Sequence, residues 1–276
     1  MKPRTLLPKS LLMKQKQTRV VIVTGGSSGI GLATVERLVK RGDIVYEFSR
    51  HGSSNDGVTH ITCDITNEEN VKTAVQQVVD EQGRIDVLVN NAGFGISGPI
   101  EFTKTEDAKK QFDVNFFGAL NVTKAVIPLM RKKHHGRIVF VSSVAAVFSI
   151  PYQSFYSATK SAINSLALAL RNELKPFHIS VCSLMPGDVS TGFTANREKS
   201  NEGQEVYSRL EKSVAVMEHD ETHGMTPEKI AKKIMKITSK SRVKPLYVAG
   251  GKYALFCFLA KLLPTRFFNW IVGKLY

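Results

Sequence analysis

The sequence contains only three cysteines, and they show no spacing of the kind that binds a metal ion. Cys63, Cys182 and Cys257 are odd in number and far apart in the chain. A disulfide framework needs an even set of cysteines, and a cysteine-ligated metal needs closely spaced ones. We therefore predict three buried thiols, no metal site, and a protein of a reducing intracellular compartment, the cytoplasm.

A long uninterrupted apolar run is also missing. The C-terminal residues KYALFCFLAKLLPTRFFNWIVGKLY (252–276) are strongly apolar, but Lys261, Pro264 and Arg266 interrupt them. A helix that crosses a bilayer needs about 20 apolar residues in succession, so we expect two short amphipathic helices around Pro264 instead. Such helices could lie on a membrane as a peripheral contact, cover an apolar substrate pocket or form a subunit interface, and the sequence leaves these three open.

Acidic residues are missing from both ends of the chain. Residues 1–20 contain six Lys or Arg and no Asp or Glu, and residues 226–276 contain eleven against one Glu. The net charge of +14 therefore lies at the ends, while 21–225 are nearly neutral. A nucleic-acid site would need a basic surface interleaved with aromatic residues in the body of the protein, and none is evident there. We expect no nucleic-acid partner, and the basic ends favour an anionic membrane surface.

The first 17 residues are basic and only moderately apolar. Their apolar stretch is too short and too broken for a secretory signal. A targeting presequence and a plain flexible lead, with translation beginning at Met13, both remain open. We assign 1–17 as a flexible basic lead.

Short apolar segments alternate with segments of helical spacing along most of the chain. The expected strands fall in 19–26, 43–50, 58–66, 85–93, 136–143, 179–187 and 244–250, and the expected helices in 31–42, 67–83, 104–133, 155–177 and 226–240. Near-continuous apolar strands that alternate with helices indicate a parallel sheet covered on both faces. We predict an α/β fold, a Rossmann-type doubly wound sheet in one domain over 18–250, followed by the extension 251–276. Residues 188–225 are polar and weakly periodic, and we expect them to form a substrate lid.

A glycine-rich segment, TGGSSGIG (24–31), joins the first strand to the first helix. Glycines there allow the backbone to turn tightly and to approach a pyrophosphate, whose charge the start of a helix favours. We expect this segment to bind a dinucleotide through Gly25, Ser27, Ser28, Gly29, Ile30 and Gly31.

The end of the second strand distinguishes NAD from NADP. An NAD site places an acid there for the ribose 2′-hydroxyl, whereas an NADP site needs a cation for the 2′-phosphate. This chain has Ser49 followed by Arg50, and Glu47 lies two positions before Ser49. The pattern favours NADP(H).

The segment YSATK places Tyr156 and Lys160 four residues apart, which puts both on one face of a helix. Such a pair arises by accident roughly once in a chain of this length. Its significance comes from the order TGGSSGIG, CDIT, NNAG, DVNFFG, VSSVA and YSATK. That order resembles the short-chain dehydrogenase/reductase family in its ordinary single-domain form, over about residues 18–195.

The resemblance implies a catalytic tetrad of Asn115, Ser143, Tyr156 and Lys160. In the family's chemistry the tyrosine exchanges a proton with the substrate oxygen, and the serine stabilises the charge that develops on that oxygen. The lysine, together with an oxidised nicotinamide, would lower the tyrosine pKa from its usual value near 10. The asparagine would hold a water beside the lysine.

The resemblance also implies further contacts with the cofactor. Tyr156 and Lys160 belong to both sets. The others lie near the adenine, under it, or around the nicotinamide carboxamide, and they are Asp64, Ile65, Asn91, Ala92, Gly93, Pro186, Gly187, Val189 and Thr191.

The segment NAGFGISGPIE (91–101) resembles the family branch that acts on steroids, retinoids and related lipid carbonyls. We therefore expect an NADP(H)-dependent oxidoreductase for a small hydrophobic carbonyl or secondary alcohol. Two alternatives remain: a 3-oxoacyl-thioester reductase of lipid synthesis, against which the apolar tail argues, and a catalytically silent NADP-binding regulator, against which the intact tetrad argues. We expect a homodimer or homotetramer, although the tail departs from the usual family ending.

Overall fold

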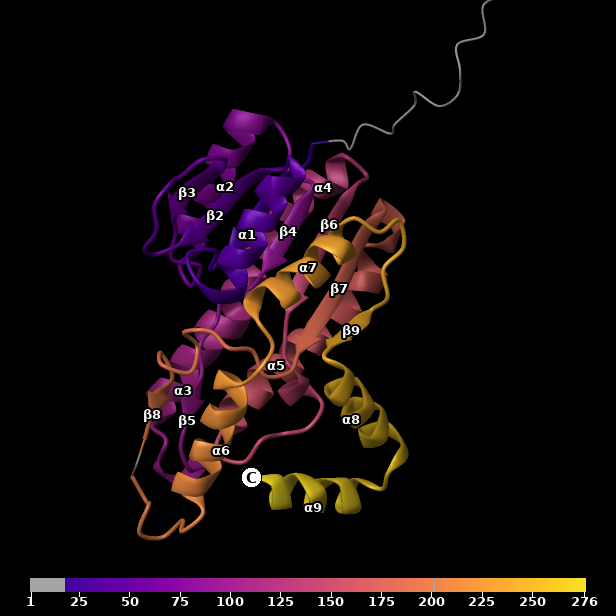
Figure 1. Cartoon of the computed structure of the whole chain (residues 1–276). Helices are drawn as coiled ribbons and strands as arrows, with labels where there is room; N and C mark the ends of the chain where they lie inside the picture. Colours follow the sequence, from indigo (N-terminus) through magenta and orange to yellow (C-terminus); the bar gives the residue numbers. More distant parts are fainter. Residues whose placement is uncertain (1–17, 201) are drawn as a thin grey trace, which may run out of the picture.

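Seven parallel strands form the central sheet of the protein. The computed structural model describes residues 18–200 and 202–276, so the predicted lead 1–17 and the start at Met13 lie outside the described residues. The strand order is β3-β2-β1-β4-β6-β7-β9, and every neighbouring pair is parallel (Figure 1). The strands are β1 (Val20–Thr24), β2 (Ile44–Ser49), β3 (Val58–Thr62), β4 (Val87–Asn90), β6 (Gly136–Val141), β7 (Ile179–Pro186) and β9 (Leu246–Ala249). The predicted doubly wound sheet is confirmed.

Each central strand is apolar throughout because both of its faces are covered. In β1, Val21 and Val23 belong to one hydrophobic cluster, and Val20 and Ile22 belong to the cluster on the opposite face. Helices α1 (Gly29–Arg41) and α7 (Pro227–Thr238) contribute to the first cluster, and α2 (Glu68–Gln82), α4 (Ala119–Lys132) and α5 (Ser154–Glu173) contribute to the second. A strand buried on both faces has no polar alternation, and this is why the apolar runs predicted a parallel sheet.

Helix boundaries follow local capping chemistry. The side chain of Asn67 accepts hydrogen bonds from the backbone N–H groups of Glu69 and Asn70 at the start of α2. The helix ends at Gly83, which adopts the left-handed conformation with φ of 65° and donates its N–H to Val79. Both devices satisfy backbone groups that a helix end leaves free.

The predicted helix over 104–133 contains an irregular section. It consists of α3 (Thr105–Phe112), π-helical turns over Asp113–Gly118, and α4. A Cβ atom on Gly118 would lie 2.7 Å from the side chain of Ile65, so glycine lets this section pack closely against the loop after β3. A π-helical turn contains about one residue more than an α-helical turn, and such turns, although rare, are frequently found at functional sites.

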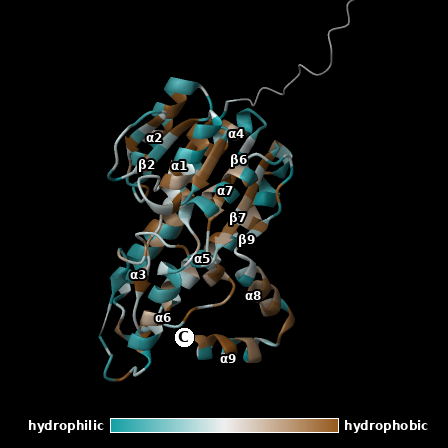
Figure 2. Ribbon diagram, in the orientation of Figure 1, coloured by the Kyte–Doolittle hydropathy of each residue, from teal (hydrophilic) through white to brown (hydrophobic). Residues whose placement is uncertain are grey.

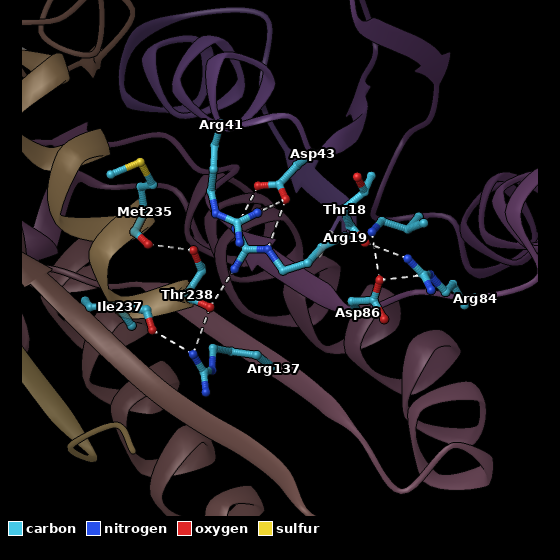
Figure 3. Close-up of polar contacts among 11 residues, drawn as sticks. Thr18, Arg19, Arg41, Asp43, Arg84, Asp86, Arg137, Met235, Ile237 and Thr238 are labelled. Carbon is cyan, nitrogen blue, oxygen red and sulfur yellow. Dashed lines mark hydrogen bonds and ion pairs between the residues drawn. The ribbon is translucent and has the colours of Figure 1, made fainter. Parts of the chain in front are cut away.

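A network of charges ties the amino ends of the strands to α7 (Figure 3). Arg19 binds the buried carboxylate of Asp43 through two hydrogen bonds of 3.0 and 2.7 Å, and Arg41 pairs with the same carboxylate. Arg19 also donates to the carbonyl oxygen of Thr238 at 2.6 Å, and Arg137 donates to the same oxygen at 2.9 Å. These bonds satisfy the last carbonyl groups of α7 and fix the end of that helix to the sheet.

The segment 188–225 contains more regular structure than its weak periodicity predicted. It forms β8 (Glu198–Lys199), which pairs with β5 (Ile96–Ser97), and α6 (Leu210–Thr222). The sequence indicated neither the β5–β8 pair nor helix α6. Figure 1 shows α6 beyond the carboxyl end of the sheet.

The two helices expected around Pro264 are confirmed as α8 (Gly251–Leu262) and α9 (Thr265–Leu275). Their inner residues join a third hydrophobic cluster with Val144, Phe148 and Met185. Within the ranges 18–200 and 202–276, none of the helices combines the length and apolar character that a membrane crossing requires. The three cysteines are buried, and in the described part of the chain they are free thiols.

Candidate active site

The predicted site residues gather at the carboxyl end of the sheet. Loops that follow β1, β4, β6 and β7 meet at this edge because parallel strands all end there. The loops carry, in order, the glycine-rich segment, the NNAG segment, Ser143 and the segment after Pro186. Helix α5 adds Tyr156 and Lys160.

The glycine-rich loop has the shape that a pyrophosphate requires. Gly25 and Gly29 adopt positive φ values of 64° and 54°. A Cβ atom on Gly31 would lie 2.0 Å from the carbonyl oxygen of Gly25, so only glycine permits this close turn. Ser27 and Ser28 are exposed, and among the described residues no side chain caps the start of α1. The loop and the free N–H groups of α1 therefore fit the phosphates of a nicotinamide dinucleotide.

The NNAG segment is tied directly to this loop. The side-chain amide of Asn91 donates to the carbonyl oxygens of Thr24 and Gly25, at 3.1 Å each. The backbone N–H groups of Asn91 and Ala92 donate to the hydroxyl of Thr24 at 3.0 and 3.1 Å. Thr24 thus links β1 to the end of β4, a role that sequence reasoning did not assign.

Two charged residues near the end of β2 differ in their surroundings. Arg50 is exposed, and the hydroxyl of the preceding Ser49 donates to the carbonyl oxygen of His51 at 2.8 Å. Glu47 is buried beneath the glycine-rich loop, next to Gly26, and pairs with His60. Of these two charged residues, Arg50 is therefore the one that is exposed beside the glycine-rich loop.

The predicted adenine-side residues follow β3. The side chain of Asp64 accepts hydrogen bonds from the N–H and hydroxyl of Thr66, at 2.9 and 2.8 Å. Ile65 is buried, and its carbonyl oxygen accepts a hydrogen bond from Asn121 at 3.0 Å.

Helix α5 brings the side chains of Tyr156 and Lys160 to the same place. The Lys160 ammonium lies 5.6 Å from the centre of the Tyr156 ring and donates to the carbonyl oxygen of Val141 at 3.0 Å. Ser143 begins a short helical turn after β6, where its hydroxyl accepts from the N–H of Ala145 at 3.1 Å. The same hydroxyl is close enough to the Tyr156 phenol to lower the pKa of that phenol. Three of the four predicted tetrad residues therefore lie together.

Asn115 reaches the site from the π-helical section. Its side chain accepts from the N–H of Phe94 and donates to the carbonyl oxygen of Phe94, both at 2.9 Å. It also donates to the hydroxyl of Thr159 at 3.2 Å. A Cβ atom on Gly93 would lie 3.0 Å from the Asn115 side-chain oxygen and 3.6 Å from the Lys160 nitrogen. The side chains of Asn115 and Lys160 therefore both lie next to Gly93, and the Asn115 side chain also binds the backbone of Phe94, the residue after NNAG.

Burial dominates the ionisation of the two central groups. Desolvation raises the pKa of Tyr156 to about 12, against a smaller lowering by the hydrogen bond with Ser143. Desolvation also lowers the pKa of Lys160 to about 8. Each shift favours the neutral form, as expected when an ionisable group leaves water. The lowered tyrosine pKa expected from the sequence needs the charge of an oxidised nicotinamide beside Lys160, so it stays a prediction for the cofactor-bound protein; in the protein alone, burial has the larger effect.

The segment 188–225 packs directly on these groups. The ring of Phe193 lies 5.6 Å from the ring of Tyr156, and the guanidinium of Arg197 lies 5.7 Å from the Phe193 ring. Arg197 is fully buried and pairs with Glu221 of α6, whose carboxylate also accepts from the hydroxyl of Thr194 at 2.6 Å. No motif in the sequence indicated Phe193, Arg197 or Glu221; an arginine and an aromatic residue within a polar segment were the only signal.

The remaining predicted residues lie where β7 ends. Pro186 is the last residue of β7, and Val189 forms an isolated bridge with Met225. The side chain of Thr191 lies 3.4 Å from the position of a Cβ atom on Gly29, so it faces the glycine-rich loop. Gly187 lies against the ring of Tyr253, whose hydroxyl donates to Asp188.

The comparisons with known proteins agree with this geometry. A family model described as short chain dehydrogenase matches residues 19–202. The chain is 43% identical over 228 residues to 3-ketodihydrosphingosine reductase of Bacteroides thetaiotaomicron. The aligned region covers 81% of this chain and 85% of that protein. It is 34% identical over 278 residues to dehydrogenase/reductase SDR family member 7B of Xenopus tropicalis, covering 94% and 86%.

The solved structures include a short-chain dehydrogenase from Streptomyces avermitilis with a TM-score of 0.80 and 29% identity, covering 90% of this chain and 94% of that one. The family match and the shared parallel sheet confirm the resemblance that the motif order suggested. The chain therefore belongs to the short-chain dehydrogenase family of oxidoreductases, which use a nicotinamide cofactor.

Proposed function

We propose that this protein is an NADP(H)-dependent reductase of a ketone on a hydrophobic, lipid-like substrate. The observation that carries the proposal is the meeting of Ser143, Tyr156 and Lys160 beside Phe193, in a member of an oxidoreductase family. The 43% identity to a 3-ketodihydrosphingosine reductase favours a long-chain amino ketone of that type as the substrate.

Bound NADPH would supply a hydride to the carbonyl carbon. Tyr156 would then give its phenolic proton to the carbonyl oxygen, so that the ketone becomes a secondary alcohol. A phenol with a pKa of about 12 is protonated at neutral pH and is therefore able to donate. Ser143 would donate a hydrogen bond to the same oxygen and stabilise its developing charge.

Lys160 and Asn115 would hold the reacting groups in place. The amine of Lys160 lies within reach of both the Tyr156 ring and the cofactor-side loop at Gly93. With a pKa of about 8, it would carry a proton for much of the time at neutral pH and could return one toward Tyr156 after each turnover.

The preference for NADP(H) is supported by the residues after β2. Arg50 is exposed beside the glycine-rich loop, where it would bind the 2′-phosphate, while Glu47 is buried and contacts His60. Guanidinium groups suit phosphate because they donate two parallel hydrogen bonds.

The preference for a hydrophobic substrate is supported by the surroundings of Ser143. The next residue, Val144, begins the third hydrophobic cluster, which also contains Phe148, Phe268 and the partly buried Phe256. An alkyl chain that leaves the reacting carbonyl would meet apolar side chains on this side. We propose that 188–225, with Phe193 over Tyr156, is the lid that closes over it.

The proposal is tested with 3-ketodihydrosphingosine, NADPH and the variant Tyr156→Phe. We expect turnover, followed as the loss of NADPH absorbance, to fall about 10²–10⁴-fold, the usual contribution of a positioned proton donor. NADPH binding, measured by fluorescence titration, should stay within about twofold of the wild type, because the ring remains. Retained turnover would refute Tyr156 as the acid.

The matched control is Tyr46→Phe. Tyr46 is buried in β2, and its hydroxyl binds Glu81 at 2.6 Å, away from the site. This variant should keep the wild-type turnover number while losing some stability. A wild-type protein that reduces the keto group of 3-oxoacyl thioesters but not the long-chain amino ketone would overturn the substrate class and leave the role of Tyr156 standing.

A further inference from the structure

Large apolar side chains are exposed along the outer side of the two C-terminal helices. Six residues of α8 and α9 are between 49% and 63% exposed, and they are Leu255, Phe258, Leu262, Phe267, Trp270 and Leu275. Figure 2 shows the corresponding hydrophobic colouring on both helices. Scattered exposed apolar residues are normal, but several on one pair of short helices indicate an interaction site.

These outer residues are additional to the residues that hold the helices in place. Cys257, Phe268 and Val272 are buried and pack in the third hydrophobic cluster with Phe148 and Met185. The outer Phe267 and Trp270 stack on each other with ring centres 5.9 Å apart. The helices are therefore apolar on two sides, and only one side is used by the fold.

Exposed cations surround the same apolar residues. Lys252, Lys261, Arg266 and Lys274 are exposed, and the sequence has no Asp or Glu after Glu228. Within the described residues none of these four belongs to an ion pair. Apolar and aromatic side chains among lysines and arginines suit the headgroup region of an anionic bilayer.

We propose that this α8–α9 surface, the six apolar residues with the four cations, binds peripherally to an anionic lipid bilayer. A second copy of the chain is a poorer partner, because a symmetric dimer would bring the same four cations of each subunit together. An anionic bilayer instead supplies the opposite charge and accepts the apolar side chains.

The surface is joined to the active site at both of its ends. Tyr253, in the first turn of α8, packs on Gly187 and binds Asp188. At the end of α9, Arg209 donates to the carbonyl oxygen of Gly273 at 2.7 Å, and the hydroxyl of Ser213 in α6 donates to the backbone oxygen of Tyr276. A bilayer on this surface would therefore lie beside the lid, where a long-chain substrate could pass from the lipid into the site; this consequence rests on the proposed function.

The test is flotation of the full-length protein with vesicles of phosphatidylcholine alone or of phosphatidylcholine with phosphatidylglycerol. We expect binding to the anionic vesicles and weak binding to the neutral ones. The variant Phe258→Ser with Trp270→Ser should bind at least about tenfold more weakly, a loss of about 1.4 kcal/mol for the pair, because both apolar side chains would leave the lipid.

Charge is tested with Lys261→Glu, Arg266→Glu and Lys274→Glu combined. The matched control reverses three exposed lysines of α7 instead, Lys229, Lys232 and Lys236, with the same change in net charge. The first set should abolish the preference for anionic vesicles, and the control should largely keep it. Equal effects of both sets would overturn the proposed surface, because net charge alone would then explain binding.

Two further outcomes overturn the proposal. The wild-type protein could remain free of anionic vesicles, or the Phe258 and Trp270 variant could convert a dimer to a monomer in light scattering without any change in vesicle binding. Reduction of a short soluble ketone should be unchanged in the surface variants. Loss of turnover in Tyr156→Phe with intact vesicle binding separates failure of the chemistry from failure of the surface.

Discussion

Two side chains of opposite charge near the end of β2 are the basis of the proposed preference for NADP(H). Arg50 is exposed, whereas Glu47 is buried and paired with His60. Glu47 lies beneath the glycine-rich loop, where its burial keeps it from the surface at which a ribose hydroxyl would bind. The sequence alone left Glu47 as a conflicting signal, and its burial explains why the exposed cation should prevail.

We expect Arg50→Asp to shift the cofactor preference from NADPH toward NADH by roughly 10- to 100-fold in kcat/KM. The estimate combines the loss of a charge-assisted hydrogen bond, about 1.5–3 kcal/mol, with repulsion between the new carboxylate and the 2′-phosphate. Steady-state kinetics with both cofactors measures it. The control Lys40→Asp reverses an exposed cation at the end of α1 and should leave the ratio unchanged. An unaltered ratio in Arg50→Asp would exclude the phosphate contact.

At the scale of residues, the sequence could predict which side chains meet but not how they ionise. The four-residue spacing of Tyr156 and Lys160 on one helix is enough to bring them together. Their pKa shifts depend on desolvation by groups that are distant in sequence, such as Phe193, which lies over Tyr156. No local pattern encodes that contact.

At the scale of elements, the strands of the sheet could be predicted from the sequence, whereas the elements of the segment 188–225 could not. The strands of the sheet were predictable because each is an apolar run buried on both faces. In contrast, β8 consists of the exposed residues Glu198 and Lys199, which become a strand only by pairing with β5. Helix α6 buries only Leu210, Ser213 and Met217, so its periodicity is weak. Both elements are defined by contacts with the rest of the molecule.

The charge network at the amino ends of the strands gives a second prediction at this scale. The Asp43 side chain is fully buried and binds two arginines, and one of these, Arg19, also holds the end of α7. We expect Asp43→Ala to lower the free energy of unfolding by about 3–5 kcal/mol, because it leaves poorly solvated cations without their partner. Urea unfolding followed by circular dichroism measures the change.

The control for Asp43→Ala removes an acid whose ion pair is exposed. Glu69 pairs with Lys72 on the surface of α2 at 2.6 Å, and both side chains are largely exposed. Glu69→Ala should change the free energy of unfolding by less than about 1 kcal/mol. Similar losses in both variants would show that the buried network around Asp43 does not hold the end of α7 to the sheet. Asp43→Asn, which keeps the side-chain volume, distinguishes lost charge from lost packing.

At the scale of the whole molecule, the described residues form three hydrophobic clusters that hold different parts of the fold together. Two clusters lie on the faces of the sheet and are built by the strands and their covering helices. The third joins α8 and α9 to the chain after Ser143 and to Met185 near the end of β7. The extension is thus part of the fold on its inner side, and on its outer side it carries the surface proposed to bind lipid.

A variant truncated after Gly250 tests how much the third hydrophobic cluster contributes to the stability of the fold. Removing α8 and α9 takes away Cys257, Phe268 and Val272, and fully burying a large apolar side chain contributes about 1.5–3 kcal/mol. We expect the free energy of unfolding to fall by roughly 5 kcal/mol, with more binding of a hydrophobic dye to the uncovered Val144 and Phe148. The sheet should persist in circular dichroism, since its two clusters do not depend on the extension. Turnover of a short soluble ketone should fall as well, because Tyr253 no longer supports Gly187.

Phe258→Ser with Trp270→Ser should instead keep the wild-type stability and soluble-ketone turnover, because both side chains are on the exposed side. A truncated chain as stable as the wild type would show that the third cluster has no part in holding the fold.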